Sequence, residues 1–167
     1  MKSKSLDEKF MELALLEARK AQEIGEVPIG AVVVAENGEV VGRGFNRRET
    51  WQDPTAHAEL LAMREAAETL QSWRLVGCTT YVTLEPCPMC AGTMVNARLE
   101  RVVYGARDPK AGAVRSLFAL LEDPRLNHIV QVSEGCLVTR CGDILTDFFR
   151  EIREGRVRKP LPIARDE

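Results

Sequence analysis

The sequence has no long hydrophobic run. No stretch of its 167 residues approaches the roughly 18 apolar residues that a membrane-spanning helix requires. Residues 1–5 are largely polar and lead into an amphipathic segment, whereas a signal peptide would continue with an apolar core. We therefore expect a cytoplasmic protein that makes no contact with a membrane.

Histidine is scarce, and the cysteines do not suit a disulfide framework. The chain has two histidines, His57 and His128, and five cysteines, of which only Cys87 and Cys90 form a Cys-x-x-Cys pair. An odd number of cysteines argues against a secreted disulfide scaffold. A zinc ribbon would need a second Cys-x-x-Cys pair, so that class is excluded as well.

A strong charge of either sign is also absent. The net charge is -2, with 45% hydrophobic and 29% charged residues, as in an ordinary globular protein. One local basic surplus occurs at residues 150–159, which include four arginines and one lysine. It can be interpreted as a phosphate-binding edge or as a helix end that carries cations near its C-terminus.

The length fits one domain with a hydrophobic core of its own. We expect a single domain over residues 1–167. Its last part, residues 155–167, contains Pro160 and Pro162 and is expected to be a frayed tail.

Hydrophobic periodicity and turn signals predict helices that alternate with strands after an initial hairpin. The order αββαβαβαβα implies an α/β fold, a three-layer α-β-α sandwich with a five-stranded mixed sheet and five helices. Such a fold places a metal where two helix N-termini approach each other over the sheet. The expected helices are 6–24, 54–70, 88–98, 116–121 and 137–154, and the expected strands are 28–35, 39–45, 79–84, 101–106 and 129–132.

The cysteine pair lies where a predicted strand becomes a helix, and His57 lies near the start of another helix. Catalytic zinc usually takes three protein ligands and leaves the fourth position to water. His57, Cys87 and Cys90 supply three ligands, and Glu59 is well placed beside the water, as metal-assisted hydrolysis requires. The alternative is a structural zinc site closed by His128.

The pattern His57-Ala58-Glu59, followed by Pro86-Cys87-Pro88-Met89-Cys90, resembles the H-x-E and P-C-x-x-C signature of the zinc-dependent nucleoside deaminases, the cytidine and deoxycytidylate deaminase superfamily. Further stretches narrow this resemblance to the bacterial tRNA-specific adenosine deaminases, over roughly residues 6–154. These stretches are residues 25–31, 54–59, 81–87, 102–106, 127–128 and 147–150, together with Asn46 and Asp108.

The resemblance implies hydrolytic conversion of the wobble adenosine of a tRNA anticodon to inosine, by a homodimer with one Zn²⁺ ion per subunit. It assigns His57, Cys87 and Cys90 to the metal and makes Glu59 the catalytic proton shuttle. The tRNA anticodon stem-loop would be the partner. The implied substrate contacts are Ile29, Asn46 and Asn127 around the flipped adenosine, and Asp108, Lys110, Phe149 and Arg153 at the neighbouring nucleotides.

Two other functions compete with this one. A deaminase of a free base or nucleoside, such as guanine or cytosine, would need neither a basic rim nor a stacking phenylalanine. A zinc module that binds RNA without catalysis would hold the metal but release no ammonia.

Overall fold

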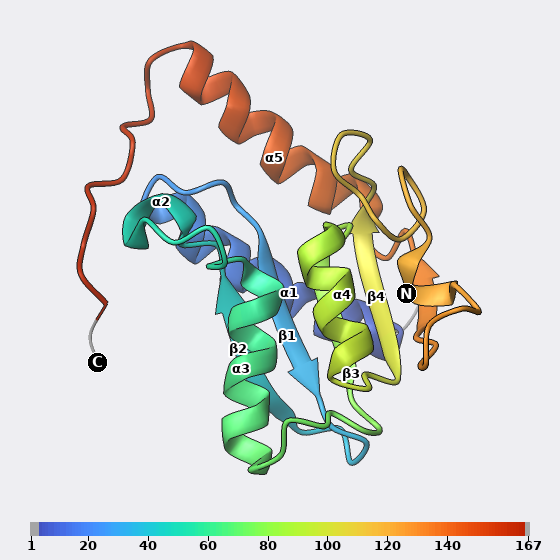
Figure 1. Ribbon diagram of the computed structural model, residues 1–167. Coiled ribbons are helices and arrows are strands. Elements are labelled where there is room, and N and C mark those ends of the chain that lie inside the picture. Colours follow the sequence, from blue (N-terminus) through green and yellow to red (C-terminus); the bar gives the residue numbers. More distant parts are fainter. Residues whose placement is uncertain (1–3, 166–167) are drawn as a thin grey trace.

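A five-stranded sheet forms the middle layer of the protein, whose computed structural model describes residues 4–165 (Figure 1). The strand order is β2-β1-β3-β4-β5. Strand β1 is antiparallel to β2 and β3, whereas β3, β4 and β5 run parallel, so the prediction of a mixed sheet is confirmed. The strands are β1 (Gly30–Val34), β2 (Val40–Phe45), β3 (Thr79–Leu84), β4 (Arg101–Ala106) and β5 (Gln131–Glu134).

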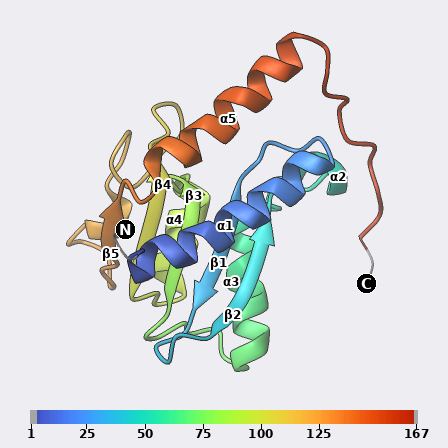
Figure 2. The same ribbon diagram turned by 180° about the vertical axis from the view of Figure 1, so that it is seen from behind.

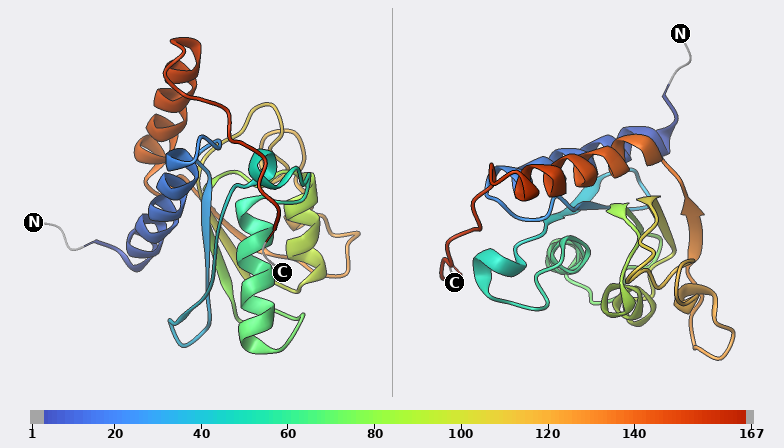
Figure 3. Two further views of the ribbon diagram at one scale, coloured as in Figure 1. Left: turned by 90° about the vertical axis from the view of Figure 1, so that its left-hand side faces the viewer. Right: turned by 90° about the horizontal axis from the view of Figure 1, so that it is seen from above.

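Helices cover both faces of this sheet. Seen from behind, α1 (Leu6–Glu23) and α5 (Val138–Arg153) cross one face (Figure 2), and the view from above separates the three layers (Figure 3). The opposite face carries α3 (Ala58–Leu70) and α4 (Pro88–Asn96). Each face buries its own hydrophobic cluster against the strands. No helix within residues 4–165 is both long and apolar enough to cross a membrane.

The helix around the histidine begins later than expected. Its N-cap is His57, whose backbone is extended, and α3 starts at Ala58 rather than at Pro54. The Asp53 carboxylate accepts hydrogen bonds from the backbone amide and the hydroxyl of Thr55, so it closes a turn instead of capping the helix.

Three further elements differ from the prediction. A short helix, α2 (Arg48–Trp51), occupies a segment expected to be loop. The helix predicted at 116–121 is replaced by a single 3₁₀ turn, Leu120–Glu122. The last strand, β5, begins at Gln131 rather than at Ile129.

Two glycines of β2 allow α3 to lie directly on the strand. A Cβ atom added to Gly42 would lie 2.1 Å from the carbonyl oxygen of Ala62, and one added to Gly44 would lie 2.3 Å from that of Ala58. Side chains at these positions would therefore push away the N-terminal end of α3. The close approach fixes the position of His57 and Glu59 over the sheet.

The C-terminal segment lies beside α2 (Figure 1). The amide of Ile163 donates to the carbonyl of Thr50 at 2.8 Å. Arg165 forms an ion pair with Asp53, and its guanidinium lies 5.0 Å from the ring centroid of Trp51. This arrangement differs from the frayed tail expected for 155–167, of which residues 166–167 lie outside the described part.

The first turn of α1 is tied to the sheet by Asp7. Its carboxylate accepts two hydrogen bonds from the Arg101 guanidinium, at 3.0 and 2.7 Å, and one from the Tyr81 hydroxyl at 2.9 Å. The bonds from Arg101 lower the pKa of Asp7 below its usual 3.8, although burial acts in the opposite direction. The network therefore stabilises the folded state most when Asp7 is ionised.

Replacing Asp7 with asparagine should lower the free energy of unfolding at pH 7 by roughly 1–2 kcal/mol. A lowered folded-state pKa contributes stability that is complete above 3.8 and disappears as the pH falls through the folded value. Urea unfolding of the wild type and of Asp7→Asn, near pH 7 and near pH 3, should show that the difference in their free energies of unfolding becomes smaller in acid. A gap of the same size at both pH values would contradict this account.

Candidate active site

Two helix N-termini meet above the sheet and carry the metal-ligating side chains. His57 is the N-cap of α3, Cys87 is the N-cap of α4, and Cys90 lies in the first turn of α4. The Nδ1 atom of His57 lies 3.6 Å from the Sγ atom of each cysteine. The predicted meeting of two helix starts is confirmed, and it brings together three ligands that are distant in sequence.

The spacing of these atoms fits zinc. With Zn–S bonds of about 2.3 Å and Zn–N bonds of about 2.0–2.1 Å, a tetrahedral ion separates nitrogen and sulfur ligands by about 3.6 Å. Both observed Nδ1–Sγ distances have this value. Within residues 4–165 the ligand group consists of His57, Cys87 and Cys90 alone. Three ligands leave one position for water, as in catalytic zinc sites.

His128 does not close the site. Its Nε2 atom lies 2.6 Å from the carbonyl oxygen of Leu99, beyond the C-terminal end of α4. Cys87 and Cys90 lie at the opposite end of that helix. The alternative of a four-ligand structural zinc site that includes His128 is therefore not supported.

Glu59 lies in the first turn of α3, two residues after His57, and is 4% exposed. Burial raises the pKa of its carboxyl group to about 7, while its own backbone amide and the nearby His57 oppose that rise. This buried carboxylate also lines the cavity beside the metal ligands. It is therefore within reach of a water molecule or a substrate atom bound there.

The two thiols have different proton affinities. A hydrogen bond from Cys90, supported by one with His57, lowers the pKa of the Cys87 thiol to about 4. The same contact with Cys87, together with burial, raises the pKa of Cys90, and the hydrogen bond with Cys87 raises that of His57. The lowered pKa of Cys87 favours its thiolate, the form that binds metal ions, and a dication held here would displace the proton from the Cys90 thiol.

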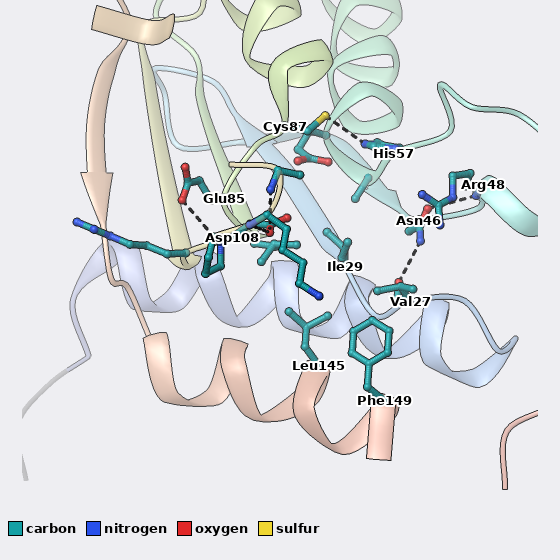
Figure 4. Close-up of a pocket in the computed structure, with 17 residues that line it drawn as sticks. Val27, Ile29, Asn46, Arg48, His57, Glu85, Cys87, Asp108, Leu145 and Phe149 are labelled. Atoms are coloured by element: carbon teal, nitrogen blue, oxygen red, sulfur yellow. Dashed lines mark hydrogen bonds between the residues drawn. The ribbon is translucent and has the colours of Figure 1, made fainter. Parts of the chain in front are cut away.

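Two of the three metal ligands, His57 and Cys87, line a cavity of ≈ 520 Å³. This volume falls within the range of about 300–1,000 Å³ that is common for small-ligand sites. Figure 4 shows that side chains from strand ends, loops and α5 point into it. Five of the seven predicted substrate contacts line the cavity, namely Ile29, Asn46, Asp108, Lys110 and Phe149.

One wall of the cavity follows the end of β2 and the start of α2. Asn46 is held at both ends of its side-chain amide, which donates to the Val27 carbonyl at 3.3 Å and accepts from the Arg48 amide at 3.2 Å. Behind it, the buried Glu26 carboxylate accepts from the amide and hydroxyl of Thr50 in α2. These bonds fix α2 and keep Asn46 and Arg48 at the cavity.

The opposite wall is formed by α5. Leu145 and Phe149, one helical turn apart, both line the cavity (Figure 4). Phe148 is buried in the core and packs edge-on against Phe149, with ring centroids 5.6 Å apart. Of the two neighbouring phenylalanines, Phe149 is therefore the one available to a ligand.

Two predicted substrate contacts lie outside this cavity. The Asn127 side chain accepts a hydrogen bond from Arg98 at 3.3 Å, beyond the end of α4 that is distant from the metal ligands. Asn127 therefore does not line this cavity, and its contact with the adenosine stays a prediction. Arg153 lies at the end of α5, one turn beyond Phe149, and does not line the cavity either. Its contact with neighbouring nucleotides stays a prediction.

Sequence reasoning missed other residues that line the cavity, among them Arg48, Glu85, Arg107 and Leu145. Two of them carried a local signal. Glu85 directly precedes the cysteine motif, and Leu145 lies four residues before Phe149, hence on the same helix face. The position of Arg48 at the cavity depends on helix α2, which begins at this residue and was not predicted.

Comparison with known proteins gives consistent matches. The family model for the cytidine and deoxycytidylate deaminase zinc-binding region matches residues 4–106. The chain is 54% identical over 148 residues to the tRNA-specific adenosine deaminase of Bacillus subtilis (strain 168), covering 89% of this chain and 91% of that one. The protein of the same name from Haemophilus influenzae is 45% identical, with coverage of 89% and 86%.

A solved structure described as "Biochemical and Structural Studies of A-to-I Editing by tRNA:A34 Deaminases at the Wobble Position of Transfer RNA" superposes with a TM-score of 0.78. It is 48% identical in sequence, and the match covers 82% of this chain and 99% of the other. The sequence comparison and the structural comparison thus match this chain to the same kind of protein over most of its length.

Proposed function

This chain belongs to the tRNA-specific adenosine deaminase family, and on that premise we propose that it converts the wobble adenosine of a tRNA anticodon to inosine. The observation that carries the proposal is the triangle of His57, Cys87 and Cys90, two of whose members line one cavity together with Glu59. The arrangement provides three metal ligands and a buried carboxylate on the same side of a ligand-sized space.

The residues divide the work of hydrolysis. His57, Cys87 and Cys90 hold one zinc ion, which when bound supplies a Lewis acid that activates water. Glu59 accepts a proton of the attacking water and delivers it to N1 of adenine. The water oxygen bonds to C6, and Glu59 then moves the remaining proton of that oxygen to the amino nitrogen. The C6–N bond breaks as the C6 carbonyl forms, so that adenosine and water give inosine and ammonia.

The cavity walls suit a nucleotide taken out of a stacked strand. Asn46 and Ile29 line the same cavity as His57 and Cys87 and would contact the flipped base. Phe149 offers a partly exposed ring, and Lys110 a cation, where neighbouring nucleotides would lie. Aromatic stacking combined with cations on the rim is a common way to bind single-stranded nucleic acid.

A substrate series tests the proposal against its competitors. Zinc-loaded protein is incubated with an anticodon stem-loop that carries a wobble adenosine, with the same stem-loop carrying guanosine there, and with free adenosine, cytidine and guanine. Inosine in the first RNA alone supports the proposal. Ammonia from a free base or nucleoside at a comparable rate would indicate the small-molecule deaminase, and no product from any substrate would indicate a zinc module.

Removing the exposed ring should weaken RNA binding. Phe149→Ala should raise the KM for the stem-loop by about tenfold, because stacking one base on an aromatic ring contributes roughly 1–3 kcal/mol. Ile152→Ala is a matched control, since both side chains lie on α5 and both are 43% exposed. Steady-state kinetics of the two variants should separate them, and equal KM values would argue against stacking on Phe149.

We further propose one domain per chain, assembly as a homodimer, and a cytoplasmic location together with the tRNA. Exposed apolar side chains occur repeatedly between residues 117 and 129, which supports burial against a second copy. Sedimentation equilibrium should give twice the chain mass of 18.6 kDa. The side chains concerned are Leu117, Phe118, Leu126 and Ile129.

A further inference from the structure

The Glu85 carboxylate is buried at the centre of one loop. The side chain is 2% exposed, and its five hydrogen-bond donors all come from residues 108–116. Oε1 accepts from the Asp108 amide at 3.2 Å and from the Ser116 hydroxyl at 2.5 Å. Oε2 accepts from the amides of residues 114, 115 and 116, at 3.2, 3.0 and 3.0 Å.

These donors require that both oxygens of the Glu85 side chain accept hydrogen bonds. Four amides can only donate, and an ionised carboxylate can only accept. The loop also approaches Glu85 too closely for a side chain, because a Cβ atom added to Gly112 would lie 2.2 Å from Oε2. Backbone amides of the loop therefore surround the Glu85 carboxylate in the way that a nest of amides surrounds a bound anion.

The same loop lines the cavity, as Glu85 itself does. Asp108 and Lys110 line the cavity, and the Asp108 carboxylate accepts from the amides of residues 110 and 111. Glu85 lies two residues before the metal ligand Cys87. One short segment thus carries both a metal ligand and the anchor of a loop that lines the cavity (Figure 4).

We propose that Glu85 is a positioning residue that fixes the loop 108–116 relative to the metal centre and thereby sets which nucleotides beside the target base are accepted. The part that concerns nucleotides rests on the proposed function. The structural part stands on the five hydrogen bonds alone. Glu85 itself takes no part in proton transfer, which belongs to Glu59.

Glu85→Gln is the single substitution that tests this role most directly. If its one oxygen remains at the Oε2 position, three amides keep their acceptor, and the new NH₂ group faces the Asp108 amide, donor against donor. The Ser116 hydroxyl can rotate to accept. The loop should remain joined to its neighbours through the bond from the Ala113 amide to the Pro86 carbonyl, which does not involve the Glu85 side chain. The substitution therefore removes the hydrogen bond from the Asp108 amide and leaves the other contacts of the loop in place.

Amide hydrogen exchange followed by NMR tests the structural part without any substrate. In Glu85→Gln the Asp108 amide should lose about tenfold or more of its protection, since a partly buried donor is left without its partner. The amides of residues 114–116 should lose less. Trypsin should also cleave faster after Lys110. Unchanged protection at Asp108 would refute the anchoring role, whatever the enzyme's substrate.

Kinetics test the functional part. Glu85→Gln should keep zinc and raise the KM for the stem-loop by about tenfold, with a smaller change in kcat. It should also narrow the rate difference between stem-loops that differ only in the bases beside the wobble position. Ser116→Ala, which removes one of the five donors and leaves the four amides paired, should show the same change to a smaller degree.

Leu15→Ala in α1 controls for loss of stability alone, because Leu15 is buried in the cluster on the opposite face of the sheet. It should lower Tm but leave discrimination between stem-loops intact. If Glu85→Gln discriminates as well as Leu15→Ala does, the positioning role is refuted. If the wild type deaminates no stem-loop, the proposed function fails, and the exchange experiment still decides whether Glu85 anchors the loop.

Discussion

Glu59→Gln should reduce deamination of the stem-loop by about 10³-fold, within the range of about 10²–10⁴ that general acid–base catalysis contributes. Glutamine has nearly the same shape and can form hydrogen bonds, but it cannot accept and return a proton. The metal ligands are other side chains, so zinc should remain bound. Single-turnover formation of inosine measures the rate, and atomic spectroscopy measures the zinc content.

The control for this substitution lies on the same helix. Glu68 is also in α3, but it is exposed and lies two helical turns and more from the cavity. Glu68→Gln should retain both activity and zinc. If Glu59→Gln kept activity within a few fold of the wild type, another group would have to move the proton. Loss of zinc together with activity would instead show that Glu59 supports the metal site.

The residues nearest the chemistry could be predicted because their signal is local. Cys87 and Cys90 are close in sequence, and His57 and Glu59 are two residues apart. A metal restricts which residue types can occupy such positions, so residue type, ligand count and local spacing together indicated the group that the structure assembles. The mixed sheet could be predicted for a similar reason, since alternating apolar strands and amphipathic helices allow few arrangements.

Other features of the structure depend on contacts between distant segments. The start of α3 was misplaced because Asp53 binds Thr55, and nothing local shows whether an aspartate caps a helix or closes a turn. The position of Asn127 depends on the path of a long loop to the far end of α4, where Arg98 binds it. Such features follow from packing, which periodicity does not encode.

Removing a metal ligand should lower zinc affinity, activity and thermal stability together. Cys90→Ala leaves two protein ligands, and zinc affinity should fall by more than the roughly 10–100-fold that loss of an outer-shell partner causes. Activity should fall to background. Cys78→Ala is the matched control, because Cys78 is equally buried in the core but lies outside the ligand group. It should lose some stability but no zinc.

Thermal unfolding with and without a chelator separates metal binding from packing. A ligand that binds only the folded state stabilises it by RT ln(1 + [L]/Kd), so removing zinc should lower the Tm of the wild type and of Cys78→Ala. Cys90→Ala should unfold at the same temperature with or without chelator. A chelator-sensitive Tm in Cys90→Ala would mean that the ion is held without this sulfur. Because His57, Cys87 and Cys90 belong to the starts of two different helices, a bound ion joins α3 to α4, and the difference in Tm measures that link directly.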